Sequence, residues 1–579
     1  AGPMLAPKSE GEAVVTHVAP DEFGRALPEA TVEHSGQTGT SQDACACAHV
    51  RESGFSFTSK MRVPLACFAQ YLTLSSFVYI PSIYISLFRG NATLIGAANM
   101  AMVLFDIVIH PYFGQLSDAG FFNRWVFRDV CSWGRRAPLM LLSIPVCMLS
   151  CVLQWMGPEK LQTPLAVALW YAVVRFLLTL GMSMFETAFQ AGFTELFPTK
   201  AERVNIGLAK LFVALVAGSL GSAGVAPSAL GVKDPGTPHQ RQLFALFGVL
   251  TGGCWILAVP YACLQRRSIM TRTVQSASLW GSMREFWHAS PAFRCWAAST
   301  HLYSAGVLLT LTGLPFYCEV VLNYTSEQVE TAMRVLILGA AVMVPLSMPV
   351  VAYMTNHLSP PKLSGISGLL CILVAPCHVH ALHGIPGQFW PQVVQVSIIC
   401  GAGVGVLSVS WEGAQSALFT WIVNEDQVRR AEIQGASCAA AKSHNRIPER
   451  RDGMINSFRT SFSVLAGAWA GLFHILLGAL GYDGARSKDN TGEPQPHEVR
   501  VMLELLFILV VPAIFAIFAI SMFRFPLQGE RLDVLASSYA RMYDTLVSGA
   551  EAVKGSSAGS PREGPAEAGH AVPGLIMSL

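Results

Sequence analysis

Long runs of apolar residues follow one another along most of the chain, separated by short polar segments. A helix of about 20 apolar residues crosses the roughly 30 Å hydrocarbon core of a membrane. Each run is expected to be helical, because lipid offers no hydrogen-bond partners to unpaired backbone groups. Twelve such runs occur, at residues 63–88, 93–113, 137–156, 165–190, 204–228, 241–265, 292–318, 330–353, 363–383, 392–422, 454–480 and 499–523. The pattern predicts an all-α membrane protein with 12 transmembrane helices.

Polar segments divide these helices into two groups of six. We expect one six-helix bundle over residues 60–268 and a second over 292–526. The cytoplasmic loop between them, 269–291, has apolar residues at helical spacing, which is typical of an interfacial helix. Residues 1–59 lack such periodicity and are expected to form a disordered cytoplasmic N-terminus. Residues 527–579 are expected to form a cytoplasmic tail.

Composition and charge exclude several classes of function. Of the 579 residues, 52% are hydrophobic and 13% charged, which is outside the range of soluble globular proteins. The formal net charge of +2 and the lack of a basic stripe argue against nucleic acid as a partner. No nucleophile elbow, P-loop or HExxH motif occurs, so we predict no enzymatic activity. His378, His380 and His383 do not share a helical face, so we expect no metal and no other cofactor.

Basic residues set the expected orientation. They gather after the second, fourth, sixth and tenth runs, at Arg124, Arg128, Arg135, Arg136, Lys200, Arg203, Arg266, Arg267, Arg272, Arg284, Arg429, Arg430, Lys442, Arg446, Arg450 and Arg451. Because basic loops stay on the cytoplasmic side, both termini should be cytoplasmic. The membrane could be the plasma membrane or an internal one.

An internal repeat supports the division into halves. Residues 186–194 and 412–420 share Glu, two Ala, Phe and Thr in register, at an offset of 412 − 186 = 226 residues. The same offset maps the first run onto the seventh. A duplication of six helices, each half carrying an acid in its fourth helix, is what the halves of a major facilitator transporter would show.

Several ionisable residues lie inside the predicted helices. Each costs about 2.5–3.5 kcal/mol at the bilayer centre, so it normally faces a polar cavity or a partner. Asp106 and His110 are four residues apart and share a helical face, so they can titrate as a coupled pair. We interpret them as the site of cation or proton coupling; the alternative is a structural ion pair that holds helices together.

The remaining charges suggest a solute site. Arg175 and Glu186 are eleven residues apart, about three turns, and therefore also share a face. We predict that the solute is bound by Glu186, Lys210, Gln190, Arg175 and Glu412. His301, His474 and Glu504 are interpreted as helix–helix hydrogen-bonding or interfacial groups. Arg334 and Arg459 also lie inside apolar runs, and Gly467 and Gly471 are expected close-packing positions.

The motifs of the second and third helices resemble those of the glycoside-pentoside-hexuronide:cation symporters. This group contains melibiose permease and the sodium-dependent lysophosphatidylcholine transporters. The matching segments are 106–111, 114–118 and 133–138, with further matches at 186–196, 202–203, 210, 450–453 and 525–527. The resemblance implies the major facilitator fold, a cation-binding Asp106 and a solute-binding Glu186. It also implies a cytoplasmic gate formed by Gly114, Asp118, Arg135 and Arg136.

Two departures from the family pattern bear on coupling. His110 replaces a second aspartate that would complete a sodium site, and Val464 stands where a functional lysine is expected. Proton coupling is therefore favoured over Na⁺ coupling. We predict a monomeric, proton-coupled secondary transporter that moves a small polar solute, a sugar or polyol, across the lipid bilayer by alternating access. The alternatives are transport of a lysophospholipid or other amphiphile, and a non-transporting membrane receptor or scaffold.

Overall fold

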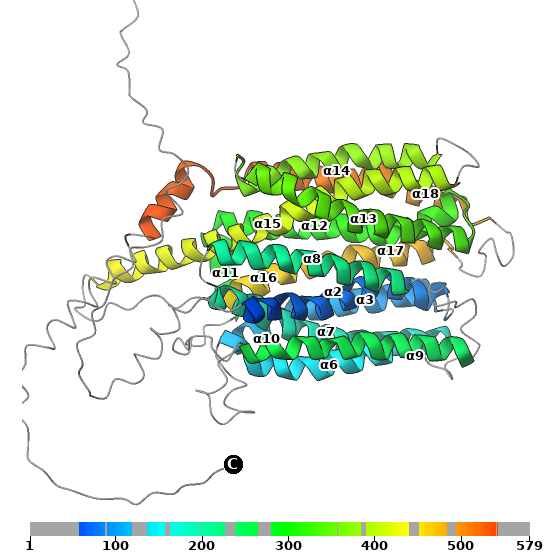
Figure 1. Ribbon diagram of the computed structural model, residues 1–579, viewed down its shortest axis with the longest axis horizontal. Coiled ribbons are helices and arrows are strands. Elements are labelled where there is room, and N and C mark those ends of the chain that lie inside the picture. Colours follow the sequence, from blue (N-terminus) through cyan, green and yellow to red (C-terminus); the bar gives the residue numbers. More distant parts are fainter. Residues whose placement is uncertain are drawn as a thin grey trace, which may run out of the picture. The chain divides into compact units, whose positions relative to one another are not determined.

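A computed structural model describes most of the chain between residues 57 and 541 (Figure 1). The described residues are 57–86, 88, 90–118, 136–156, 163–197, 200–225, 238–264, 279–355, 357–383, 389–438, 451–482, 494–539 and 541. All of them belong to one unit, Phe55–Leu579. Within these ranges the regular structure is entirely helical, as the apolar pattern predicted.

Helices occupy the first six predicted ranges. They are α2 (Phe57–Ser86), α3 (Ala92–Asp118), α6 (Ala137–Trp155), α7 (Pro164–Leu196), α8 (Lys200–Val225), and α9 (Pro238–Gly253) continued by η3 (Cys254–Ala258) and α10 (Val259–Leu264). Residues 279–289 of the predicted loop form α11 (Leu279–Ala289). Phe286 of α11 is buried against Phe293 and Phe458, whereas Trp280 is exposed. This short helix therefore rests against the second half of the chain.

The last six ranges are helical as well. They hold α12 (Pro291–Phe316) with the π-turn η5 (Tyr317–Val321), α13 (Ser326–Thr355), α14 (Pro360–His383), α15 (Phe389–Cys438), α16 (Asp452–Leu465) with α17 (Gly467–Ala479), and α18 (His497–Leu505) with η7 (Leu506–Val510) and α19 (Val511–Phe523). Seven helices in the described part are long and apolar enough to cross a membrane. They are 92–118, 137–155, 164–193, 242–264, 291–321, 453–479 and 497–523.

Two predicted boundaries need correction. The apolar run 392–422 ends well before its helix, because α15 continues to Cys438 on charged residues that form ion pairs. The run 454–480 matches the apolar segment 453–479, but its helical bonding is interrupted at Ala466, between α16 and α17. The N–H of Ala466 bonds to the carbonyl of Ser463 instead of the carbonyl four residues back. Both differences arise from hydrogen bonds and charges, to which a hydropathy pattern is blind.

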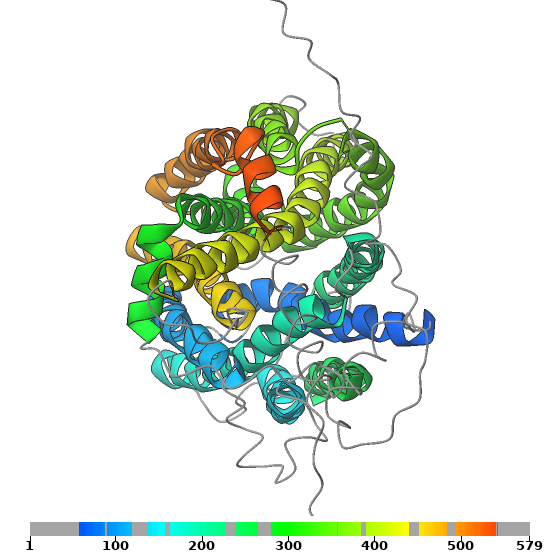
Figure 2. The same cartoon turned by 90° about the vertical axis from the view of Figure 1, so that its left-hand side faces the viewer.

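The two halves pack their helices in the same order. In the first half α2 packs on α8, α7 on both α3 and α6, and α6 on α9. In the second half α12 packs on α16, α15 on both α13 and α14, and α14 on α19. Figure 2 shows the blue to teal helices together with the green α9 in its lower part and most of the light green to orange helices in its upper part, with the gold α16 beside the blue helices in between. The structure thus carries the duplication that the sequence repeat predicted.

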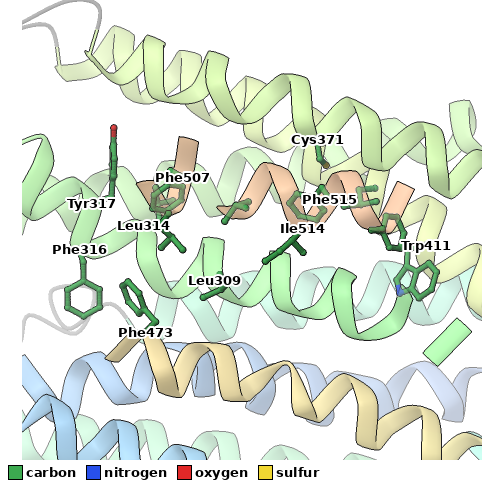
Figure 3. Close-up of a cluster of buried hydrophobic side chains, with 14 of the residues drawn as sticks. Leu309, Leu314, Phe316, Tyr317, Cys371, Trp411, Phe473, Phe507, Ile514 and Phe515 are labelled. Carbon is green, nitrogen blue, oxygen red and sulfur yellow. The ribbon is translucent and has the colours of Figure 1, made fainter. Parts of the chain in front are cut away.

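Aromatic and aliphatic side chains fill both halves. Figure 3 shows part of the larger cluster, in which Trp411, Phe515 and Leu309 pack between α15, α19 and α12. In the first half, Phe185 of α7 meets Trp255 edge to face, with ring centroids 5.0 Å apart. These clusters hold the helices whose polar side chains face one another across the halves.

The halves meet mainly along α3, which packs against both α16 and α17. Glycines permit this close approach: a Cβ at Gly96 would lie 2.9 Å from the carbonyl oxygen of Gly471, and one at Gly114 would lie 2.4 Å from Oγ of Ser457. Gly471 is thus the close-packing position that its sequence context predicted. A smaller contact joins α8 to α13 and α15.

Candidate functional site

Asp106 and His110 form a compact polar group inside α3. Their Oδ1 and Nδ1 atoms are 2.7 Å apart. Ser183 of α7 donates a hydrogen bond from its hydroxyl to the same carboxylate oxygen. His110 is buried, and its Nε2 has no hydrogen-bond partner among the described residues. One ring nitrogen is therefore held by Asp106, while the other is buried and has no partner in the described part of the chain.

Arg175 lies nearer to this pair than the sequence suggested. We expected it to share the solute site with Glu186, because both lie on one face of α7. Arg175 is instead close enough to interact electrostatically with Asp106 and Tyr171. Tyr171 in turn donates its hydroxyl hydrogen to Asn99 of α3. Arg175 thus belongs spatially to the α3–α7 group, where it adds a positive charge beside Asp106.

Glu186 faces a cation from the other half of the molecule. Its Oε1 lies 3.9 Å from Nη2 of Arg459 on α16. The other terminal nitrogen of Arg459 donates to Oε1 of Gln415 on α15 at 2.6 Å. The guanidinium lies 5.7 Å from the ring of Trp296. Three helices of the second half therefore hold Arg459 against the fourth helix of the first half.

Sequence reasoning did not select Arg459 for the solute site. The family resemblance pointed to position 464, five residues further along, and Arg459 was noted only as a charge inside an apolar run. That signal was sufficient to make it a candidate. Its partner could not be deduced, because the pairing depends on how α7 and α16 cross.

Lys210, Glu412 and Gln190 lie around the same region. Phe189 lies one turn after Glu186 on α7, and Nζ of Lys210 is 5.4 Å from the centre of its ring. Cys67 of α2 lies within electrostatic range of Lys210, Glu412 and Glu186 together, so charges of both halves converge on α2. Gln190 is half-buried on α7. Three of the predicted solute-binding residues, Glu186, Lys210 and Glu412, thus lie within electrostatic range of one buried cysteine on α2.

Asp118 ties the end of α3 to the start of α16. Its Oδ1 is 3.0 Å from Nη2 of Arg136, and its Oδ2 accepts the backbone N–H of Met454 at 3.1 Å. Met454 is in the first turn of α16, where backbone N–H groups lack helical partners and attract negative charge. Arg136 is fully buried and also donates to Ser117. A carboxylate of the first half therefore caps a helix of the second.

The gate motif is only partly described. Gly114 allows the close approach of α3 to α16 noted above. Arg135 lies outside the described residues, as do the side chains of His378, His380 and His383. We call the end of the helices that holds Asp118, Arg136 and the start of α16 the basic end.

A second charged network lies at the basic end within the later half. Arg451, just before α16, makes a two-pronged contact with the carboxylate of Glu285 on α11, both bonds at 3.1 Å. It also bonds Asp426 on the extension of α15 at 3.0 Å. Arg429 and Arg430 bind the same Asp426 at 2.9 and 2.8 Å. The hydrogen bond from Arg451 lowers the pKa of Glu285, against the opposing effect of partial burial. The sequence did not predict this network.

The family model described as "MFS/sugar transport protein" matches residues 64–529. The chain belongs to this family of the major facilitator superfamily and is a secondary transporter, not an enzyme. No curated protein sequence matches it. Among solved structures, the chain is similar to a mutant of the nucleoside transporter NupG, with 13% sequence identity and a TM-score of 0.46. That match covers 84% of this chain and 100% of the other.

Proposed function

We propose that the protein couples proton movement to transport of a small hydroxyl-rich solute, a sugar or polyol. The observation that carries the coupling is the arrangement of His110. Its Nδ1 is held by Asp106, and its buried Nε2 has no partner in the described structure. A carboxylate and an imidazole in contact titrate as a pair and can take up one proton together.

Sodium is a poorer match to the same site. Hard cations are normally bound by several oxygen ligands. Here a histidine occupies the position of the second carboxylate, and one oxygen of Asp106, Oδ1, is engaged by both Ser183 and His110. Proton uptake needs no further ligand.

The solute would bind between the halves. Glu186 can accept hydrogen bonds from hydroxyl groups, while Arg459 and Gln415 can donate to them from the opposite half. The Glu186–Arg459 distance of 3.9 Å leaves this ion pair open to competition by a solute hydroxyl. Uptake of a proton at Asp106 and His110 would change the relative free energies of the two transport states.

The basic end would face the cytoplasm. Arginine-rich connections gather there, and short basic loops remain on the cytoplasmic side of membranes. In this orientation the bond from Asp118 to the start of α16 closes the cytoplasmic side, and both chain termini would be cytoplasmic.

Uptake into proteoliposomes tests the proposal. A library of sugars, polyols and lysophospholipids would be offered with an imposed pH gradient, and separately with a sodium gradient at equal pH. We expect accumulation of a hydroxylated solute driven by the pH gradient alone. Transport of a lysophospholipid only would favour the amphiphile alternative, and dependence on sodium would contradict proton coupling.

Two variants separate coupling from solute binding. Asp106→Asn and His110→Gln remove the titrating groups but leave Glu186 and Arg459 in place. Both should lose accumulation driven by the pH gradient while still exchanging solute across the membrane. Glu327→Gln, an exposed acid at the start of α13, is the matched control and should accumulate solute normally. Unchanged accumulation in both variants would contradict the coupling role.

A further inference from the structure

Pro111 leaves one backbone carbonyl of α3 without its helical donor. In a continuous α-helix the carbonyl of Ile107 would accept the N–H of residue 111, but proline has none. The hydroxyl of Ser461, on α16 in the other half, lies 3.0 Å from this carbonyl. Backbone groups inside a membrane need a partner, and here a side chain from the opposite half supplies it. A proline has thus turned a bond within one helix into a bond between the halves.

The same hydroxyl has a second acceptor on its own helix. The carbonyl of Ser457, one turn earlier on α16, lies 3.1 Å from Oγ of Ser461. A hydroxyl carries one hydrogen and can serve only one acceptor fully at a time. If α3 moves away, the hydroxyl can turn to Ser457, and no buried donor loses its partner. The contact between the halves can therefore break without leaving the buried hydroxyl of Ser461 without an acceptor.

The next residue of α16 is anchored within its own half. The break at Ala466 frees the carbonyl of Phe462, which lies 3.1 Å from Nδ1 of His301 on α12. Nε2 of the same histidine lies 3.1 Å from the indole nitrogen of Trp469 on α17. An indole N–H only donates, so Nε2 accepts and Nδ1 carries the proton given to Phe462. His301 thus bonds to both sides of the break.

We infer that Pro111, Ser461 and His301 form a reversible joint, here called the α3–α16 clasp, along which the halves separate and close during transport. Ser461 and His301 act as positioning residues. Ser461 provides the bond that breaks and re-forms, and His301 makes α16 and α17 move with the rest of the second half. The carbonyl of Ile107 adjoins Asp106, so the clasp lies one residue from the proposed coupling site. The inference rests on the transport activity of the family and not on the identity of the solute or ion.

A double-mutant cycle tests the clasp. Wild type, Ser461→Ala, Pro111→Ala and the double variant would be purified as full chains in detergent, without solute. Backbone hydrogen exchange would be measured in peptides covering residues 453–465. Ser461→Ala should raise exchange there about threefold, which corresponds to one hydrogen bond between membrane helices.

The decisive comparison is between the two backgrounds. With alanine at position 111, a backbone N–H can serve Ile107, so Ser461→Ala should then change exchange much less. Equal effects in both backgrounds, or none in either, would overturn the inference. Pro111→Ser restores the same N–H should the alanine variant not fold.

Control variants separate the clasp from general loosening. Ser461→Thr keeps the hydroxyl and should behave as wild type. Ser397→Ala removes a buried serine of α15 whose hydroxyl donates to the carbonyl of Val393 on the same helix. This variant should leave hydrogen exchange in α16 unchanged.

His301→Leu should raise hydrogen exchange around residues 466–470. His301→Gln retains a donor and an acceptor and should not raise it. Equal exchange in these two His301 variants would overturn the role of His301. No solute or pH gradient is used, so this outcome is independent of the proposed proton coupling.

Discussion

Arg459 shows how one residue can join the two halves through charge. It contacts Glu186 of α7 and Gln415 of α15, and both ionic side chains are mostly buried, with 10% and 21% of their surface exposed. Replacing either partner alone leaves the other charge partly buried and unpaired. We expect Arg459→Gln and Glu186→Gln each to lower the free energy of unfolding by about 1–3 kcal/mol. The double variant should lose less than the sum of the two, as measured by thermal unfolding in detergent.

An exposed ion pair provides the control for this prediction. Arg500 pairs with Glu504 one turn away on α18, and their side chains are 46% and 34% exposed. Exposed pairs contribute about 0–1 kcal/mol, so Arg500→Gln should change stability little. Strict additivity of the Arg459 and Glu186 substitutions would mean that the two charges do not interact.

The sequence predicted contacts within one helix better than contacts between helices. Asp106 and His110 could be paired from their spacing alone, because residues four apart share a helical face. The same rule grouped Arg175 with Glu186, yet Arg175 interacts with Asp106 across α3 and α7. Which face meets which neighbour is decided by helix crossing, and a single sequence does not contain that information directly.

At the scale of elements, α11 docks on the second half through the carboxylate of Glu285 as well as through the buried ring of Phe286. Glu285 binds Arg451, and this bond lowers its pKa below the ordinary value. Because the pKa of Glu285 is lower in the folded protein than in the unfolded chain, its bond to Arg451 stabilises the docking of α11 at pH values above the unfolded-state pKa. This stabilisation is lost as the pH falls through the lower, folded-state pKa. Hydrogen exchange of α11 should therefore stay low from neutral pH down to about pH 5 and rise in more acidic solution.

A variant without the titrating group checks the cause. Glu285→Gln cannot form the ionic bond at any pH, so its α11 should exchange faster at neutral pH and show no further step on acidification. If wild type and variant had the same pH profile, another group would be responsible.

The apolar spacing of residues 279–289 sufficed to predict the helix. Its anchoring depends on Asp426 and Arg451, which are far away in sequence.

At the scale of the whole molecule, the two halves contact each other at both ends of α3. Asp118 caps α16 at the basic end, whereas Gly96 and Gly471 pack closely at the opposite end. The twelve apolar runs and the 226-residue repeat predicted helices and halves, because both follow from local hydropathy and duplication. They did not predict how the halves are held together at each end, since that depends on bonds such as the one from Asp118 to Met454.

Alternating access makes a reciprocal prediction about these two ends. Asp118→Ala removes the cap and leaves the buried Arg136 without this carboxylate, which should cost about 1 kcal/mol or more at the basic end. Each 1.4 kcal/mol shifts a two-state population about tenfold. Hydrogen exchange should therefore rise in residues 452–456. It should fall in residues 92–100 and 467–479, because opening one end closes the other.

The sign at the far end distinguishes a global transition from local fraying. If Asp118 only stabilised the first turn of α16, exchange would rise at the basic end and stay constant around Gly96 and Gly471. Asp533→Asn, at an exposed acid beyond α19, is the control for a loss of charge and should alter neither end. A fall in exchange at the far end requires the halves to move as bodies, because that end lies at the other terminus of α3. Such coupling across the full length of one helix is what a carrier with a single site between two halves needs.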